Sequence, residues 1–366
     1  MAQQLRSGIT TGACAAAAAK AAVLAWRGMF PAKVEVISPQ GRVITVPVAE
    51  AAAADDGGRA AIVKDAGDDP DITNGAIIRA SVKIAPSLPE IVLQAGEGVG
   101  IVTKPGLAVP VGQPAINPGP RAMIIRAVRE VLPECGAVVT ISVPGGEQLA
   151  ARTLNPYLGI MGGLSIIGTT GIVKPMSEEA FKNSLTPQIS VVKALGYDSI
   201  VFVPGKMGQD YAVKRYSLPG DAVVQTSNFI GHMLESAVSH GLRQVLLMGH
   251  LGKIVKVAAG IFHTHNRVAD GRLETIAAYL AAEEASAAVV REILACNTAE
   301  AAVSIIENGG FTSVYRVLAE RASTRAQRYV FGELTVGTVI LTLKGEMLGL
   351  DNNARKIGGA LGWNIK

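Results

Sequence analysis

The 366-residue sequence is poor in aromatic residues and in cysteine, and both shortages narrow what the chain can be. Phe, Trp and Tyr make up 4% of the residues and no basic run accompanies them, which disfavours nucleic-acid binding because few rings can stack on bases. The three cysteines, Cys14, Cys135 and Cys296, are widely scattered, so they indicate neither a disulfide framework nor a Cys-x-x-Cys metal pair. Reduced thiols of this kind are typical of a cytoplasmic protein.

Charged residues are also sparse, at 17%, yet we predict no membrane span and no signal peptide. The longest uncharged stretch, residues 153–173, contains Asn155, Pro156 and several glycines, which indicates loop and strand. The apolar run after Arg6 is interrupted by Lys20, and no cleavage-like segment follows it. A chain of this length with 49% hydrophobic residues is expected to form two packed domains, and its net charge of +4 favours an anionic ligand.

The first half mixes strands, a hairpin and helices, which predicts an α+β domain over residues 1–150. It opens on "GITTGACAAAAAKAA", where a threonine can cap an alanine-rich helix. Such a helix start is either a site for an anion or a helix that packs closely on a sheet. A hairpin is predicted around Pro39-Gln40-Gly41, with further strands over 76–85, 90–103 and 137–144 and a helix over 119–132.

The second half repeats a unit of strand, glycine-rich loop and helix. The strands are predicted to end near Thr169, Gly205, Asn228 and His250, a spacing typical of βα units in a parallel sheet. The fold class is therefore α/β, with a Rossmann-like parallel-sheet domain over 151–366 beside the α+β domain. We predict a helical insert over 273–325 and a terminal hairpin over 336–350, and leave open which domain the hairpin joins.

Small polar residues cluster where these strands are predicted to end, which is where ligands bind an open parallel sheet. The loops are either a cofactor-sized pocket or ordinary glycine-rich turns. "GEGVGIVTKPG" is not followed by a helix and "GHLGK" has the wrong spacing for a P-loop, so we reject both as nucleotide motifs. The candidate cofactor-binding residues are Gly168, Thr169, Thr170, Gly171, Gly205, Ser227, Asn228, Gly249, His250 and Gly252.

Two further clusters have a functional and a structural interpretation. His263, His265 and Asp270 lie in one predicted loop, where the histidines can act as an acid–base pair or serve as structural hydrogen-bonding groups. His-x-His lacks a third zinc ligand at a recognisable spacing, so we predict no metal site. The acidic stretch 65–71 does not match a calcium loop and is interpreted as a solvated turn, with a site for a sugar hydroxyl, an amide or a cation as the alternative.

Five long motifs, taken together and in this order, resemble the cobalt-precorrin-5B C1-methyltransferase family of anaerobic cobalamin biosynthesis. They are "SGITTGACAAAAAKAA", "DAGDDPDITNG", "GEGVGIVTKPGL" with "VGQPAINPGPR", "GGLSIIGTTGIVKPMSEEA" and "MGHLGKIVKVAAGIFHTHNRVADGR". They span almost the whole chain. Ser7 and Ala13 stand where Thr-like residues are expected, a small departure.

The resemblance implies that S-adenosyl-L-methionine, as methyl-donor co-substrate, methylates C1 of a cobalt tetrapyrrole. On this hypothesis His263, His265 and Asp270 are the catalytic candidates, and scattered basic residues meet the acetate and propionate groups of the macrocycle. The candidate substrate-binding residues are Thr10, Thr11, Gly12, Lys104, Lys253 and Arg267.

Two alternative functions stay open at this point. They are an NAD(P)-dependent oxidoreductase that uses the same sheet and a non-catalytic tetrapyrrole-binding protein. The partner we expect is a small-molecule substrate, with neither nucleic acid nor membrane. Membership of a pathway also suggests transient contact with other enzymes of that pathway. The oligomeric state does not follow from the sequence.

Overall fold

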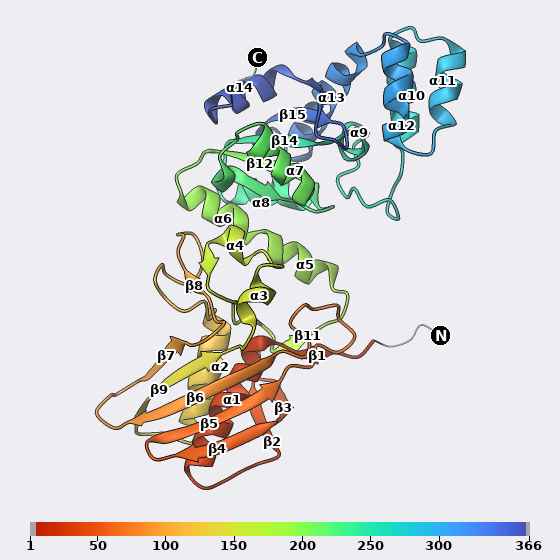
Figure 1. The fold of residues 1–366 in the computed structure, drawn as a ribbon. Coiled ribbons are helices and arrows are strands. Elements are labelled where there is room, and N and C mark those ends of the chain that lie inside the picture. The colour runs from red at the N-terminus through yellow and green to blue at the C-terminus, as the bar shows by residue number, and fades with distance from the viewer. Residues whose placement is uncertain (1–4, 364–366) are drawn as a thin grey trace. The chain divides into compact units, whose positions relative to one another are not determined.

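The computed structural model describes residues 5–363, which divide into two compact units, unit 1 up to Glu178 and unit 2 from Glu179. Both units combine helices with sheets, and the chain has parallel as well as antiparallel pairing (Figure 1). The predicted α/β class is therefore confirmed at the level of a mixed fold. No helix within residues 5–363 is long and apolar enough to cross a membrane.

Unit 1 contains a five-stranded sheet in the order β4-β5-β6-β9-β7. Its antiparallel members are β4 (Glu50–Ala54), β5 (Gly57–Val63), β6 (Ile77–Ala85) and β9 (Gly136–Ser142). Strand β7 (Ile91–Ala95) pairs in parallel with β9. The predicted hairpin is confirmed as the antiparallel pair β2 (Lys33–Ile37) and β3 (Val43–Pro47). The helices of unit 1 are α1 (Thr11–Trp26), α2 (Pro118–Arg129), α3 (Gly146–Ala150) and α4 (Asn155–Leu158).

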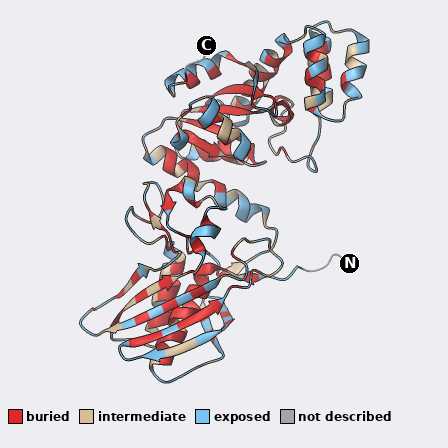
Figure 2. Ribbon diagram, viewed as in Figure 1, coloured by how far each residue is buried: buried red, intermediate tan, exposed pale blue. Residues whose placement is uncertain are grey.

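Helix α1 is buried on nearly every side, which explains its alanine run. It packs against β5, β6 and α2, and a helix enclosed in this way needs small apolar side chains all around it (Figure 2). A Cβ added to Gly58 of β5 would lie 2.1 Å from the carbonyl oxygen of Ala22, so sheet and helix touch through their backbones. The Oγ1 of Thr10 accepts from the Ala13 amide at 3.2 Å, which confirms the predicted cap.

The segment after residue 150 stays with unit 1, so the structure divides the chain later than the predicted boundary. Two short pairs tie the segment in: β10 (Ile160–Met161) with β8 (Ile101–Val102), and β11 (Ile172–Val173) with β1 (Gly8–Ile9). Isolated bridges join Leu164 to Val99 and Ile166 to Ile116. The prediction that the segment before Gly168 is a strand of the parallel sheet is therefore wrong, because the residues it pairs with belong to unit 1.

Unit 2 contains a sheet in the order β13-β12-β14-β15-β16. The first four strands are parallel: β12 (Ser199–Val203), β13 (Val223–Gln225), β14 (Gln244–His250) and β15 (Thr335–Leu341). The βα spacing predicted β12, β13 and β14, whereas β15 was expected only as part of the terminal hairpin. The last strand, β16 (Met347–Leu350), is antiparallel to β15. The sequence did not indicate which domain the terminal hairpin joins. In the structure the hairpin belongs to unit 2.

Helices cover both faces of this sheet. Alternate residues of β12, β14 and β15, such as Val201, Leu246 and Val339, form one core with Ala354 and Ile357 of α14 (Asn352–Ala360). Helices α9 (Leu251–Ala258) and α13 (Ser313–Tyr329) pack together and against β15. The helices that precede α9 are α5 (Glu178–Leu185), α6 (Pro187–Ala194), α7 (Lys206–Asp210), the π-helix Tyr211–Arg215, the 3-10 helix Gly220–Ala222 and α8 (Ile230–Ser239).

Helices occupy the stretch between α9 and β15, where a helical insert was predicted. They are α10 (Arg272–Ala282), α11 (Ala287–Leu294), α12 (Ala299–Asn308) and α13. Local backbone features separate neighbouring helices: Glu284, with φ of +63°, follows α10 before α11 begins, and Pro187 opens α6 shortly after α5 ends. The loop from residue 259 to 271, which carries His263 and His265, connects α9 to α10.

Candidate functional site

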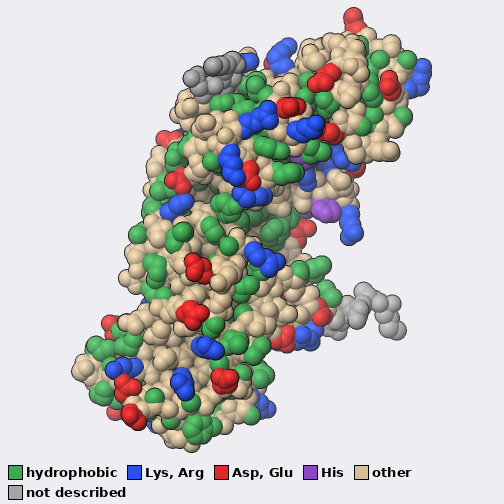
Figure 3. Space-filling model, in the orientation of Figure 1, with side chains coloured by type: hydrophobic (Ala, Val, Ile, Leu, Met, Phe, Trp, Pro, Cys, Tyr) green, Lys and Arg blue, Asp and Glu red, His purple; other side chains and the backbone are tan. Residues whose placement is uncertain are grey.

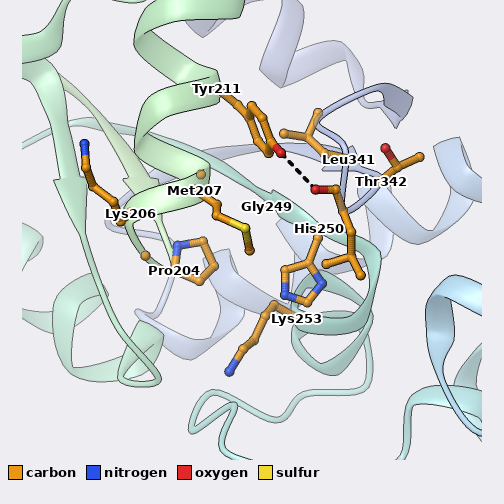
Figure 4. A pocket seen from close by; sticks show the side chains of 12 residues that line it. Pro204, Lys206, Met207, Tyr211, Gly249, His250, Lys253, Leu341 and Thr342 are labelled. Carbon is orange, nitrogen blue, oxygen red and sulfur yellow. Dashed lines mark hydrogen bonds between the residues drawn. The ribbon is translucent and has the colours of Figure 1, made fainter.

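A cavity of about 300 Å³ lies where β12, β14 and β15 of unit 2 end (Figure 4). This volume is at the lower end of the range for small-molecule sites. Met207 extends toward His250 in Figure 4, and the two side chains border the same space. The lining residues are Pro204, Gly205, Lys206, Met207, Gly208 and Tyr211 after β12, Gly249, His250 and Lys253 at β14 and α9, and Leu341, Thr342 and Leu343 at the end of β15.

The sheet order explains why a cavity forms at this place. From β12 the chain first crosses to β13 on one side and then returns to β14 on the other side. The connection that leaves β12 thus runs toward β13 on one side, and the connection that leaves β14 runs toward β15 on the other side. Open parallel sheets bind ligands in the crevice between two such connections. Strand β14 approaches Pro204 so closely that a Cβ on Gly249 would lie 3.1 Å from the proline ring, which is why glycine stands there.

The third wall of the cavity is the turn between β15 and β16, and side chains hold it in place. The Tyr211 hydroxyl donates to the carbonyl of Leu343 at 2.9 Å (Figure 4). The Tyr216 hydroxyl donates to the carbonyl of Gly345 at 2.8 Å. Arg215 donates to the carbonyl of Lys344, between those two residues, at 3.1 Å. On the other side, the Leu343 amide donates to Glu300 of α12 at 3.1 Å. The π-helix and the helical insert thus both fix this wall.

The cavity holds a neutral histidine beside cationic side chains. Burial, with smaller contributions from Lys253 and Arg272, lowers the pKa of His250 to about 4. Burial likewise lowers the pKa of Lys253, and Lys256 and Arg272 add to the effect. His250 is therefore uncharged at neutral pH, and it offers the cavity an imidazole without a positive charge.

The low pKa of His250 predicts a pH-dependent stability. Because the folded-state pKa of about 4 lies below the ordinary value of 6.5, the unfolded chain binds this proton more tightly, and stability falls as the pH drops from 6.5 toward 4. Between pH 7.5 and pH 5, the free energy of unfolding should fall by about 2 kcal/mol more in the wild type than in His250→Gln. Urea unfolding at both pH values measures this difference, with His240→Gln, outside the cavity, as the control. Equal losses in the wild type and His250→Gln would contradict it.

Two lysines of α9 hold the loop from 259 to 271 against the sheet. Lys253 donates to the side-chain oxygen of Asn228 and, at 3.3 Å, to the carbonyl of Thr264. Lys256 is fully buried and donates to Thr264, Asn266 and Ala269 oxygens at 3.1, 2.6 and 2.9 Å. A buried ammonium with three oxygen partners fixes the conformation of the segment it binds.

The predicted catalytic residues all lie on this loop, with different surroundings. The ring of His263 packs edge-on against that of Phe229, with 5.0 Å between the ring centres. The centre of the His265 ring lies 6.4 Å from that of His263. Asp270 forms a two-pronged ion pair with Arg272 at 2.7 Å, and this contact lowers the pKa of its carboxyl. Asp270 is therefore ionised and paired. In Figure 3, histidine and basic side chains gather over the part of unit 2 that carries this loop.

Comparison with known proteins places the whole chain in one family. The family model described as CbiD matches residues 1–175, and the model described as CbiD, C-terminal domain, matches residues 263–352. The chain is 53% identical to the cobalt-precorrin-5B C(1)-methyltransferase of Moorella thermoacetica, over 100% of both chains. The chain belongs to the CbiD family. The resemblance inferred from its motifs is thereby confirmed.

Other CbiD-family relatives match over most of their length. Proteins with the same name are 47% identical in Desulfitobacterium hafniense, covering 96% of this chain and 92% of the relative, and 43% identical in Methanocaldococcus jannaschii, covering 93% and 95%. The crystal structure of the cobalamin biosynthesis protein cbiD from Archaeoglobus fulgidus is 30% identical, with a TM-score of 0.40 and coverage of 72% of this chain and 83% of that one.

Within this CbiD-family chain, the predicted cofactor-binding residues separate into two groups. Gly205, Gly249 and His250 line the cavity, and Gly252 leaves room for the His250 ring, since a Cβ there would lie 3.3 Å from it. Ser227 and Asn228 follow β13, where Asn228 contacts Lys253. The placement of the other four at this sheet edge is wrong, because they lie in unit 1: Gly168, Thr169, Thr170 and Gly171.

The predicted substrate-binding residues are also divided between the units. Lys253 lines the cavity and Arg267 is exposed on the loop of unit 2. Lys104 of unit 1 donates to the carbonyl of Tyr157 at 3.4 Å. Gly12 meets Pro120, whose Cγ would lie 2.6 Å from an added Cβ, and the Thr10 hydroxyl caps α1. Close packing explains the glycine at position 12, and helix capping explains the threonine at position 10. Contact of either residue with substrate stays a prediction.

Thr11 makes a structural contact whose loss is measurable. Its buried hydroxyl donates to the carbonyl of Ile167 at 3.1 Å and accepts from the amide of the same residue at 2.9 Å. Thr11→Val keeps the shape but leaves both backbone groups without this partner, so the free energy of unfolding should fall by about 2 kcal/mol. Urea denaturation measures the loss, and Thr170→Val, at an exposed threonine of the same unit, is the control. A midpoint equal to that of the wild type would contradict the structural role of Thr11.

Three parts of the cavity escaped the sequence analysis. Met207 lies in a glycine-rich stretch, residues 204–208, in which nothing distinguishes it from its neighbours. Tyr211 belongs to a π-helix, and such turns are frequent at functional sites but leave no clear sequence pattern. Residues 341–343 were missed because the unit to which the hairpin belongs was unknown. Among residues 5–363, no group of three His, Cys, Asp or Glu side chains is placed to hold a metal ion.

Proposed function

We propose that this chain transfers a methyl group from S-adenosyl-L-methionine to C1 of cobalt-precorrin-5B, a step of cobalamin biosynthesis. The proposal rests on one observation, the full-length similarity to proteins named cobalt-precorrin-5B C(1)-methyltransferase. The sequence identity to the protein of Moorella thermoacetica is 53%. The chain is thus an enzyme of the methyltransferase type. The cavity at the edge of the parallel sheet supports a site for the donor, and its position supports a Rossmann-like interpretation of unit 2.

The residues of the cavity fit a small cationic donor with a carboxylate tail. Gly205 and Gly249 let a ligand approach the backbone, while Met207, Leu341 and Leu343 offer apolar surface. His250 is neutral and so does not repel a sulfonium. The Lys253 ammonium, by contrast, suits a carboxylate.

The bound donor supplies a methyl group on a positively charged sulfur, which leaves as a thioether with the electron pair of the broken bond when the macrocycle carbon attacks. The chain's own part is to hold both reactants in line and to exclude water. Correct alignment contributes up to about 7–11 kcal/mol in well-oriented systems. If a proton moves, His263 and His265 are the candidates, since Asp270 is held by Arg272.

Isotope transfer tests this proposal against both alternatives. The protein is incubated anaerobically with methyl-labelled S-adenosyl-L-methionine and cobalt-precorrin-5B, and the pigment is analysed for label at C1. We expect label at that position at a rate proportional to enzyme. Bound pigment without label would favour a tetrapyrrole-binding protein, and a spectral change that depends on NAD(P)H would favour an oxidoreductase. Either result overturns the proposal.

A further inference from the structure

Four rings form a continuous row on unit 2, next to the donor cavity and outside it. Phe181 of α5 meets Phe229 edge-on at 5.7 Å, Phe229 meets His263 at 5.0 Å, and His263 is 6.4 Å from His265. We propose that this aromatic row (Phe181, Phe229, His263 and His265) is the surface on which the flat face of the cobalt tetrapyrrole rests. The inference builds on the proposed function, because it names where the methyl acceptor binds.

Burial divides the row into a support and a contact surface. Phe229 is 6% exposed and touches both neighbouring rings, so it fixes their positions from within. Phe181 is 49% exposed, and the two histidines are half-buried. A single exposed phenylalanine is unremarkable, but one that continues a row of packed rings extends an apolar surface suited to a planar ligand.

Cationic side chains border the row, as an acceptor with carboxylate groups requires. The Lys182 ammonium lies 5.6 Å from the centre of the Phe229 ring, with the Glu179 carboxylate 3.9 Å away. Arg267 is exposed two residues beyond His265. The acid on the same loop, Asp270, is engaged by Arg272. The edge of the row is therefore complementary to acetate and propionate groups.

One side chain links the aromatic row to the donor cavity. Lys253 lines the cavity, and its ammonium contacts Asn228, which precedes Phe229, and the carbonyl of Thr264, which lies between the two histidines. The backbone joins the same segments, since Thr264 donates to the Asn228 carbonyl at 2.9 Å and Gly231 donates to Phe262 at 3.2 Å. A macrocycle on the row would thus lie beside a donor in the cavity.

Phe181→Ala in the full-length enzyme tests the inference, because an exposed side chain can be removed without unfolding the protein. Titration with cobalt-precorrin-5B, followed by absorbance, should show binding about 5- to 10-fold weaker, the size of one lost aromatic contact. The KM for the tetrapyrrole should rise in proportion, while the affinity for S-adenosyl-L-methionine stays unchanged. The matched control is Phe331→Ala, which removes a phenylalanine that is 92% exposed and remote in sequence from the row.

A fluorescence measurement locates the pigment directly. In Phe181→Trp, the emission gained over the wild type should be quenched when cobalt-precorrin-5B binds, because the cobalt macrocycle would lie against the new indole. Wild-type pigment affinity in Phe181→Ala, equal weakening in Phe331→Ala, or unquenched emission would each overturn the inference. The proposed function fails separately, through wild-type enzyme that binds both ligands without transferring label.

Discussion

Gly205→Leu is expected to weaken binding of S-adenosyl-L-methionine by about 100-fold while leaving the stability of the fold intact. Gly205 lines the cavity at the end of β12, and a Cβ added there would meet no atom within 4 Å. Its φ of −179° is extended backbone that any residue adopts, so the substitution causes no strain. With the donor bound in this cavity, as we propose, the leucine would occupy space that the donor needs, and a clash of this size costs about 3 kcal/mol of binding. Isothermal titration calorimetry measures the affinity.

The matched control is Gly359→Leu, since Gly359 also has no atom within 4 Å of an added Cβ. It lies exposed on α14 and does not line the cavity, so its variant should bind the donor like the wild type. Thermal unfolding of both variants should show that neither substitution lowers the melting temperature. Donor affinity in Gly205→Leu within threefold of the wild-type value would exclude this cavity as the donor site.

The parallel strands of unit 2 were predictable because local signals are sufficient there. Apolar runs such as residues 199–203 and 244–250 end at small residues and precede helical stretches, and the repeated spacing predicts crossover connections. The sequence therefore predicts strand ends near Gly205 and His250, and both residues line the cavity. The order of the strands was not predictable, because it depends on pairings between residues far apart in the sequence.

The same local logic fails for residues 164–171. An apolar run followed by Gly168 has the pattern of a buried strand, yet its bridges go to Val99 and Ile116 in unit 1. A strand pattern indicates burial but not the partner, so four candidate residues were placed at an edge to which they do not belong. Thr11 was similarly interpreted from its position at a helix start, whereas its hydroxyl bonds to Ile167, far along the chain.

The cavity wall between β15 and β16 was missed for a related reason. The hairpin was predicted, but not the unit that receives it, so no pattern placed Leu343 beside Gly205. The contacts that fix the wall come from Tyr211, Tyr216 and Glu300, which are distant from it in sequence. A site assembled from several segments shows its glycine-rich loops in the sequence, but not the side chains that close it.

Lys256→Met is expected to release the loop that carries the candidate catalytic histidines. The ammonium of Lys256 is 0% exposed and donates to three loop oxygens at 3.1, 2.6 and 2.9 Å. Methionine fills a similar volume without a donor, so those buried oxygens lose a partner, at a cost of about 3 kcal/mol. Hydrogen exchange should show lost protection across residues 262–269, and methyl transfer should slow about 100-fold, because a displacement near 1 Å suffices for such a loss.

The control, Lys193→Met, separates this effect from the general loss of a lysine. Lys193 pairs with Asp198 at 2.7 Å on the surface, where such a contact contributes less than about 1 kcal/mol, so turnover and loop protection should match the wild type. Lys256 contacts the loop and not the cavity, so donor affinity in Lys256→Met should stay within threefold of the wild-type value while turnover falls. Unchanged loop protection together with wild-type turnover would contradict the role of Lys256. Lost protection with full turnover would show instead that the loop's fixed position does not limit the reaction, and that His263 and His265 act, if at all, outside the slow step.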